Sequence, residues 1–205
     1  MKFITFSGVD GSGKSTQLKL LREHLERGNW NVAYFHAIEF SLANKIIRFF
    51  KRQKTFEPGK EKAVTKASLL SLLARQKFLL LDILRFRRFL RTLKKEHCDY
   101  LLSDRYFFDS IVNIEYLCHD KPPRFVFWNL RARLIENILP LPDVAFYFDL
   151  PPEMIMTRER IPEQGIDYLN KKQTLFKQKC ADWNMTVLDA SRNKEEIFQD
   201  ILKKI

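Results

Sequence analysis

Eight consecutive residues near the start of the printed sequence, Gly8 to Ser15, match the pattern GxxxxGK[ST]. Glycines let such a loop curl until successive backbone N–H groups point inward, where they can hold phosphate oxygens. The loop follows a strand-like run and opens a helix-like run, so the positive end of the helix dipole adds to the attraction. We therefore predict a binding loop for a nucleoside triphosphate. The residues expected to bind ATP are Gly8, Asp10, Gly11, Ser12, Gly13, Lys14, Ser15 and Thr16.

Three side chains at the end of this loop have distinct expected roles. Lys14 should reach the β- and γ-phosphates and act in catalysis, while the Ser15 hydroxyl should be a ligand of Mg²⁺. Thr16 should donate a hydrogen bond to the α-phosphate. The motif thus predicts ATP as phosphoryl donor and Mg²⁺ as cofactor.

The segments that must position this loop alternate between strand-like and helix-like patterns along the chain. This alternation predicts a single α/β domain over residues 1–205, with a mostly parallel sheet. The expected strands are Lys2–Ser7, Asn31–His36, Tyr100–Ser103, Asp143–Asp149 and Met185–Leu188. The expected helices are Ser15–Arg27, Ser41–Arg52, Ala63–Lys95, Phe107–Leu117, Arg131–Leu139, one that starts at Pro151-Pro152, Leu169–Ala181 and Lys194–Lys204.

The chain is basic: 36 Lys and Arg stand against 25 Asp and Glu, a formal net charge of +11. Such an excess favours an anionic partner, which could be a phosphate-bearing small molecule, a nucleic acid or an anionic membrane surface. The basic residues cluster at 48–66 and 85–95 without a nucleic-acid recognition motif or an interleaved aromatic ladder. We interpret these clusters as solvated helix faces and expect no nucleic-acid partner.

The cysteine spacing and the hydropathy of the sequence bear on where in the cell the protein is expected. The three cysteines are widely spaced and form no CxxC pair, so we expect neither a disulfide scaffold nor a zinc site, and a cytoplasmic location. The most apolar stretch, 69–90, carries six charged residues, which a lipid-exposed helix could not bury cheaply. We therefore expect no membrane association.

Several segments together resemble the thymidylate kinase family of P-loop nucleoside monophosphate kinases. FSGVDGSGKSTQ, residues 6–17, resembles the family signature FEGxDGxGKSTQ, and Asp104-Arg105-Tyr106 resembles its DRY motif at the end of the third strand. Weaker matches follow in the family's order over nearly the whole chain. They are Pro142-Asp143 through Pro151-Pro152-Glu153, the lid-like Arg158–Gly165, and Val187–Ser191, which leads to the adenine side.

The resemblance implies a three-layer P-loop kinase fold, with a five-stranded parallel sheet flanked by helices. It also implies the reaction ATP + dTMP → ADP + dTDP. Acceptor binding would fall to Asp10, at the sugar hydroxyl, and to Arg75, Arg105 and Tyr106. Arg105 would also act in catalysis, because a guanidinium can grip a monophosphate in a bidentate manner. Asp104 would orient Mg²⁺ or its waters.

The resemblance also places a lid at about residues 158–168. Some thymidylate kinases carry a catalytic arginine within the phosphate loop, whereas others supply it from the lid. The loop of this chain contains no arginine. The lid arginines Arg158 and Arg160 are therefore the expected source of positive charge for the transition state, a contribution that can reach about 10³- to 10⁵-fold in rate.

The chain departs from the family pattern on the acceptor side. Ser7 stands where the family has an acidic residue, Ala37–Ser41 replaces its REPG segment, and Ser71 aligns with its base-stacking phenylalanine. After Arg105 the family spacing DRYxxS becomes DRYFFDS. Two other functions thus stay open: a kinase of the same fold for another nucleotide, nucleoside or phosphorylated metabolite, and an ATP-binding regulatory protein without efficient transfer. Thymidylate kinases are commonly dimers through helix packing, and the long helix suits either a homodimer interface or a buried core.

Overall fold

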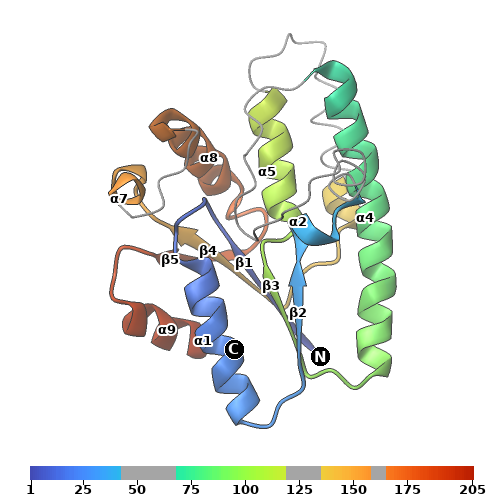
Figure 1. Cartoon of the computed structure of the whole chain (residues 1–205), viewed down its shortest axis with the longest axis vertical. Coiled ribbons are helices and arrows are strands. Elements are labelled where there is room, and N and C mark those ends of the chain that lie inside the picture. The colour runs from blue at the N-terminus through green and yellow to red at the C-terminus, as the bar shows by residue number, and fades with distance from the viewer. Residues whose placement is uncertain (43–67, 119–134, 158–164) are drawn as a thin grey trace, which may run out of the picture.

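A five-stranded parallel sheet forms the centre of the protein (Figure 1). The computed structural model describes residues 1–42, 68–118, 135–157 and 165–205. The strand order is β2-β3-β1-β4-β5, so β1 lies in the middle. Its neighbours, β3 and β4, are not adjacent to it in sequence, so crossover connections join the strands. The strands are β1 (Lys2–Ser7), β2 (Val32–His36), β3 (Tyr100–Asp104), β4 (Val144–Asp149) and β5 (Met185–Asp189).

Helices cover both faces of the sheet and complete three layers, as the family resemblance implies. The helices are α1 (Lys14–Arg27), α2 (Ala37–Phe40), α4 (Leu69–Lys95), α5 (Phe107–Cys118), α7 (Pro152–Met156), α8 (Gly165–Lys179) and α9 (Lys194–Leu202). Helices α1 and α9 pack over one apolar cluster, which includes Ile4, Phe6 and Leu21. Helices α4 and α5 pack over a second cluster on the other face, around Phe86 and Phe107. The sequence prediction of an α/β fold is confirmed.

Most predicted boundaries agree with the structure to within a few residues, with two informative differences. Helix α4 begins at Leu69, where the Ser68 side chain accepts a hydrogen bond from the Ser71 backbone N–H. The predicted start at Ala63 and most of the predicted helix 41–52 lie outside the described residues. Helix α8 begins at Gly165, four residues earlier than predicted, so the end of the expected lid at 165–168 belongs to a helix.

The carboxyl ends of all five strands lie at one edge of the sheet, because the strands are parallel. Register pairs Phe6 of β1 and His36 of β2 with Asp104 of β3. Ligands of open α/β sheets bind at this edge, next to the point where the strand order reverses. Here that point is β1, which pairs with β3 on one side and β4 on the other.

Helix α8 is fastened to this edge and to the helix layer by polar contacts. Gln173 Nε2 donates to Asp149 Oδ1 (2.7 Å) and to the Leu150 carbonyl (3.2 Å), and Lys177 Nζ lies 2.9 Å from Asp149 Oδ2. Lys179 Nζ lies 3.0 Å from carboxylate oxygens of both Glu115 and Glu136. These contacts fix the helix against the end of β4 and against α5.

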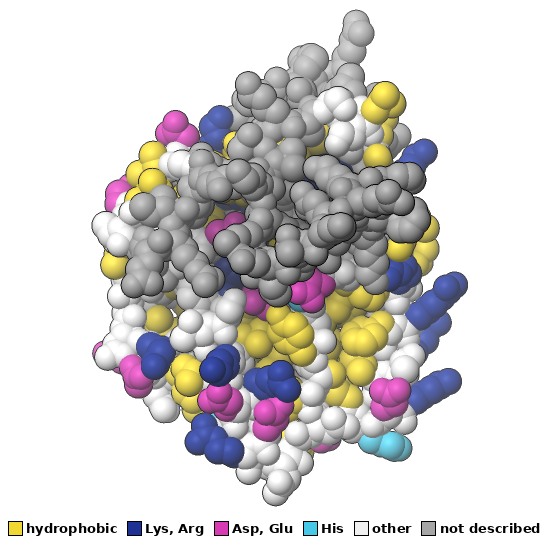
Figure 2. All heavy atoms as spheres, viewed as in Figure 1, with side chains coloured by type: hydrophobic (Ala, Val, Ile, Leu, Met, Phe, Trp, Pro, Cys, Tyr) yellow, Lys and Arg dark blue, Asp and Glu magenta, His cyan; other side chains and the backbone are white. Residues whose placement is uncertain are grey.

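The surface is strongly basic along α4. In Figure 2, Lys and Arg side chains project from the edge that α4 occupies in Figure 1. The exposed basic residues of the second half of this helix are Arg87, Arg88, Arg91, Lys94 and Lys95. Among the described residues, no helix is both long enough and apolar enough to cross a membrane.

Candidate active site

The phosphate-binding loop joins β1 to α1 and takes its shape from glycines. Gly8 has φ of +143°, and a Cβ added there would lie 2.9 Å from the carbonyl oxygen of Phe148 in β4. Gly13 has φ of +91° directly before the helix, a left-handed conformation that favours glycine. The loop therefore curls around the start of α1, and the helix dipole points toward its centre.

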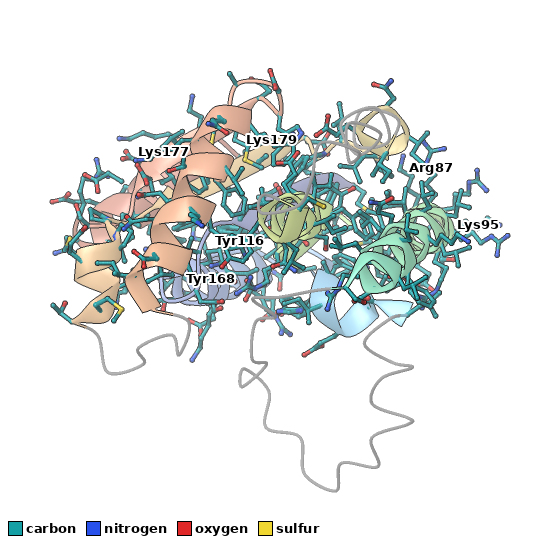
Figure 3. The ribbon with its side chains drawn as sticks, turned by 90° about the horizontal axis from the view of Figure 1, so that it is seen from above. Arg87, Lys95, Tyr116, Tyr168, Lys177 and Lys179 are labelled. Carbon is teal, nitrogen blue, oxygen red and sulfur yellow. The ribbon has the colours of Figure 1, made fainter. Side chains whose placement is uncertain are left out.

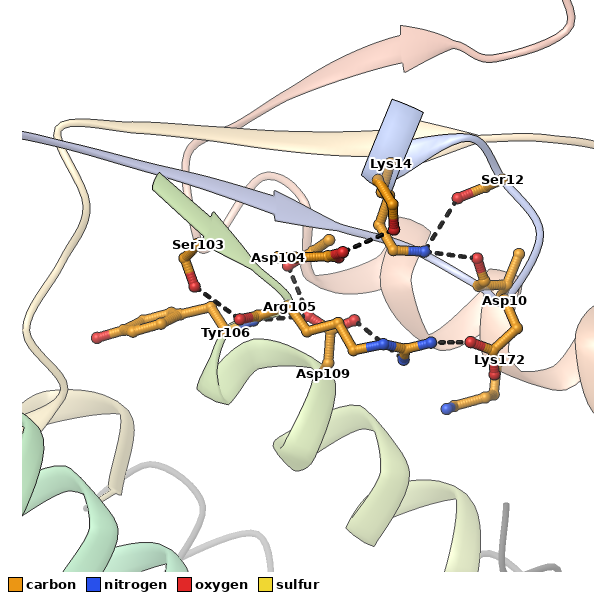
Figure 4. Close-up of polar contacts among 12 residues, drawn as sticks. Asp10, Ser12, Lys14, Ser103, Asp104, Arg105, Tyr106, Asp109 and Lys172 are labelled. Carbon is orange, nitrogen blue, oxygen red and sulfur yellow. Dashed lines mark hydrogen bonds and ion pairs between the residues drawn. The ribbon is translucent and has the colours of Figure 1, made fainter. Parts of the chain in front are cut away.

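Lys14 lies across this loop with its ammonium group held by loop oxygens. Its Nζ donates to the Val9 carbonyl (2.8 Å) and to Ser12 Oγ (3.2 Å), as Figure 4 shows. Burial lowers the pKa of Lys14, and the nearby carboxylates of Asp104 and Asp109 partly oppose this effect. A buried ammonium with neutral oxygen partners is poised to exchange them for phosphate oxygens.

Ser15 and Asp104 meet beside the loop, although they are distant in sequence. Ser15 Oγ donates a 2.6 Å hydrogen bond to Asp104 Oδ2, and the Asp104 side chain is buried. A hydroxyl and a carboxylate are hard oxygen donors, which Mg²⁺ prefers, and this ion usually takes only one or two protein ligands beside phosphate oxygens and water. The donor set fits Mg²⁺. In the described parts of the chain, no group of three or more His, Cys, Asp or Glu could hold a metal by itself.

Arg105 sits at the turn that follows β3, in a left-handed conformation with φ of +65°. Its backbone N–H donates to the Phe6 carbonyl (2.9 Å), and its carbonyl accepts from Ser103 Oγ (2.7 Å). The guanidinium forms an ion pair with Asp10 of the phosphate loop, and its Nη1 lies 3.9 Å from Asp109 Oδ1. The structure thus brings three predicted site residues together, Asp10, Asp104 and Arg105, at the edge of the sheet.

Asp109 on α5 is a site residue that the sequence analysis missed. Its Oδ2 accepts hydrogen bonds from Ser7 Oγ (2.7 Å) and from the Tyr106 backbone N–H (3.2 Å). Its Oδ1 is buried without a hydrogen-bond partner among the described residues. Ser7 takes the position of an acidic residue in the family pattern, so α5 supplies a carboxylate next to the position where the family signature has one on β1.

Lys172 on α8 is a second missed residue. Its side chain is buried, and its Nζ donates to the Tyr168 hydroxyl at 3.0 Å. Burial and, to a smaller extent, the positive charge of Arg105 lower the pKa of Lys172, Asp109 partly opposes them, and the resulting pKa is about 8. Figure 3 shows Tyr168 of α8 beside Tyr116 of α5, and the two rings meet edge to face with centroids 5.0 Å apart. No local motif marks Lys172 in the sequence.

Two residues predicted to bind the acceptor have different positions. Arg75 lies half-buried on α4, and its Nε is buried without a hydrogen-bond partner among the described residues. Tyr106 is fully buried between Phe3, Phe86 and Phe108, and its hydroxyl donates to the Pro140 carbonyl. The chain reversal at Arg105 directs the Tyr106 side chain into the core, and acceptor binding by Tyr106 stays a prediction.

The remaining predicted residues lie in or next to the phosphate loop, or outside the described residues. Thr16 is exposed on the first turn of α1, and Gly11 has φ of +82° within the loop. A pocket of about 160 Å³ opens beside them toward α9. It is lined by Ser12, Gly13, Thr16, Gln17, Phe148, Ala190, Arg192, Lys194 and Ile197. Arg158 and Arg160 lie outside the described residues.

Comparisons with known proteins show the family of the chain. A family model described as thymidylate kinase matches residues 6–201. The chain is 27% identical over 209 residues to "Probable thymidylate kinase 1" of Saccharolobus solfataricus, with 100% of this chain and 96% of that protein covered. It is 29% identical over 216 residues to the thymidylate kinase of Thermosipho melanesiensis, with 99% and 96% covered.

A solved structure supports the same fold. The crystal structure of thymidylate kinase from Ehrlichia chaffeensis superimposes with a TM-score of 0.62 at 19% sequence identity. The match covers 98% of this chain and 97% of that one. With the family model spanning the loop, the DRY segment and the late strand, the chain belongs to the thymidylate kinase family of ATP-dependent phosphotransferases.

Proposed function

We propose that the protein transfers the γ-phosphate of ATP to dTMP, giving ADP and dTDP. One observation carries this proposal: two cationic groups, Lys14 in the phosphate loop and Arg105 after β3, flank Asp104 at one edge of the sheet. Phosphoryl transfer between two anions needs positioning and positive charge more than covalent chemistry. Lys14 supplies the positive charge that positions the donor phosphates, and Arg105 supplies the charge that positions the acceptor phosphate.

On the donor side, backbone N–H groups of the loop and the Lys14 ammonium hold the phosphates of ATP. Ser15 and Asp104 would hold Mg²⁺, which neutralises charge on the phosphates when it is bound. The pocket toward α9 takes the adenine, since it adjoins Gly13 and Thr16 and has Phe148 and Ile197 among its lining residues. Thr16 then lies at the level of the α-phosphate.

On the acceptor side, Arg105 binds the monophosphate and orients its attacking oxygen toward the donor. To do so, the guanidinium exchanges part of its contact with Asp10 for the phosphate, which leaves the Asp10 carboxylate available to the sugar hydroxyl. Arg75 contributes a guanidinium from α4, where its buried Nε lacks a protein partner among the described residues. Arg158 and Arg160, in the proposed lid at about 158–168, would supply further charge in the transition state.

The experiment that tests this function is ADP release with ATP and Mg²⁺ across a panel of dTMP, dUMP, other nucleoside monophosphates and nucleosides. Stimulation by dTMP, with the highest kcat/KM of the panel, is the expected result. A higher kcat/KM for another acceptor would reassign the substrate within the same fold. If no acceptor stimulates ADP release while ATP still binds, the protein is an ATP-dependent binding protein.

We also propose that the protein works as a homodimer in the cytoplasm. Five exposed leucines lie within one narrow arc of α4, which supports packing against the same helix of a second copy. They are Leu70, Leu73, Leu80, Leu81 and Leu84. Light scattering on Leu84→Glu tests this: the variant should be a monomer where the wild type is a dimer.

A further inference from the structure

Two lysine side chains are buried among the described residues, and both lie at the active site. Lys14 and Lys172 are each 5% exposed, and each donates hydrogen bonds to uncharged oxygens. The partners of Lys14 belong to the phosphate loop, whose function is to bind an anion. Lys172 has the same kind of environment, but it comes from α8, and the phosphate motif does not account for it.

The described residues place no carboxylate in contact with the Lys172 ammonium. Within the described residues, no carboxylate lies within ion-pair distance of its ammonium, and its one hydrogen-bond acceptor is the Tyr168 hydroxyl. Asp109 attracts Lys172, whereas Arg105 repels it and itself forms ion pairs with Asp10 and Asp109. A buried ammonium costs several kcal/mol unless an anion compensates it, and among the described residues no anion is in contact with Lys172.

The position of Lys172 indicates which anion would complete the site. Figure 4 shows its ammonium beside the Arg105 guanidinium, on the side away from Lys14. Lys172 also contributes to the potential at Lys14, whose pKa it lowers. The neighbouring cations Arg105 and Lys172 therefore lie on the acceptor side of the site. Lys172 is still close enough to Lys14, on the donor side, to lower its pKa.

We propose that Lys172 is a second phosphate-binding residue of the acceptor site, which holds the monophosphate of the acceptor nucleotide together with Arg105. The proposal rests on the transfer reaction described above. A dianionic phosphate matches two adjacent cations, and it supplies the charge that Lys172 lacks. The phosphate loop carries no arginine, so a cation from α8 would also offset the repulsion between donor and acceptor as they approach.

The direct test compares binding of dTMP and of thymidine, which lacks the phosphate, to Lys172→Met and to wild type. Calorimetry without ATP should show dTMP binding about 10- to 100-fold weaker in the variant, the loss expected for one charge-assisted hydrogen bond. Thymidine, measured by competition with dTMP, should bind equally to both proteins. Lys171→Met is the matched control, because Lys171 is the exposed neighbour on the same helix and should change neither ligand's affinity.

The pH dependence of dTMP binding gives a readout that a purely structural lysine would not affect. The groups acting on Lys172 are Arg105 after β3, Asp109 on α5 and the Tyr168 hydroxyl on α8, and together with burial they place its pKa at about 8. Phosphate favours the charged form, so dTMP affinity should fall as the pH rises from 7.5 to 9.5. The affinity of Lys172→Met should stay nearly constant over that interval.

Each outcome decides between the proposal and its alternatives. Equal dTMP affinity in wild type and Lys172→Met, or equal losses for dTMP and thymidine, would overturn it and leave Lys172 a structural residue. Lys172→Arg, which keeps the charge, should recover most of the dTMP affinity; if Lys172→Met does not fold, Lys172→Gln and Lys172→Arg carry the same comparison. If wild type itself binds no nucleoside monophosphate, the proposed function fails first and this inference fails with it.

Discussion

The donor side and the acceptor side of the site share Asp104, but they are built in different ways. The donor side is one continuous loop, in which glycine backbone and a single lysine define the anion site. The acceptor side is assembled from β1, β3, α5 and α8, with Ser7, Arg105, Asp109 and Lys172 each from a different segment. A continuous loop can be identified from sequence, whereas an assembled site depends on tertiary packing.

The two sides also differ in how their cations are compensated. Lys14 donates to two uncharged oxygens of its own loop, so its hydrogen-bond partners on the donor side are local in sequence. On the acceptor side, Arg105 forms an ion pair with Asp10, and the one hydrogen-bond acceptor of Lys172 among the described residues is the Tyr168 hydroxyl. We therefore expect substitutions on the donor side to impair the transfer step, and those on the acceptor side to impair binding of one substrate.

The largest effect is expected for Lys14→Met. Removing the charge that stabilises the transferred phosphoryl group should lower kcat by about 10²- to 10³-fold. The melting temperature should not fall, because a buried charge is replaced by an apolar side chain of similar length. Steady-state kinetics and thermal unfolding check both points. A kcat within tenfold of wild type would mean that the loop lysine is not the principal donor-side cation.

Arg105→Met should give the next largest effect, confined to the acceptor. Loss of a bidentate guanidinium–phosphate contact should lower kcat/KM for dTMP by about 100-fold and leave the KM for ATP unchanged. Initial rates measured with each substrate varied in turn give kcat/KM for dTMP and the KM for ATP. If the KM for ATP rises as much as kcat/KM for dTMP falls, Arg105 serves both substrates and the prediction is wrong.

The stability of the protein should depend on pH through Lys172. Its pKa is about 8 in the folded chain against an ordinary 10.5, so between these values the unfolded chain binds more protons and the free energy of unfolding rises with pH. From pH 7.5 to 9.5, the wild type should gain about 2 kcal/mol relative to Lys172→Met. Urea unfolding of both proteins at the two pH values measures the difference; parallel behaviour would contradict a buried, charged Lys172.

The smallest effect is expected for Tyr168→Phe. This change removes the hydroxyl that accepts from Lys172 but keeps the ring packed on Tyr116. The hydroxyl orients the ammonium without contacting the phosphate, so dTMP affinity should change by no more than about fivefold, which corresponds to about 1 kcal/mol. Calorimetry with dTMP checks this. A larger loss would indicate that the tyrosine hydroxyl, rather than the ammonium, contacts the ligand.

The sequence predicted the fold and the position of the phosphate loop between β1 and α1, for physical reasons. Apolar strands that alternate with amphipathic helices commonly form a parallel sheet covered by helices, and the loop motif determines its own backbone geometry. Asp109 and Lys172 were missed because their importance comes from contacts across the fold; Ser7 and Asp109, for example, lie 102 residues apart. The sequence also did not show that the Tyr106 side chain enters the core beside Arg105, because a single left-handed residue is enough to direct neighbouring side chains to different environments.

The attachment of α8 to the end of β4 has a consequence for the entropy of substrate binding. Gln173 and Lys177, the neighbours of Lys172 on that helix, hold it to Asp149 and Leu150, and Lys179 holds its last turn to Glu115 and Glu136. The backbone that carries Lys172 is thus ordered when the protein folds. Fixing a long side chain on binding usually costs about 0.5–1.5 kcal/mol, and a cation on a flexible loop adds the ordering of its backbone. Presented from an anchored helix, Lys172 meets the phosphate with much of that disorder already removed.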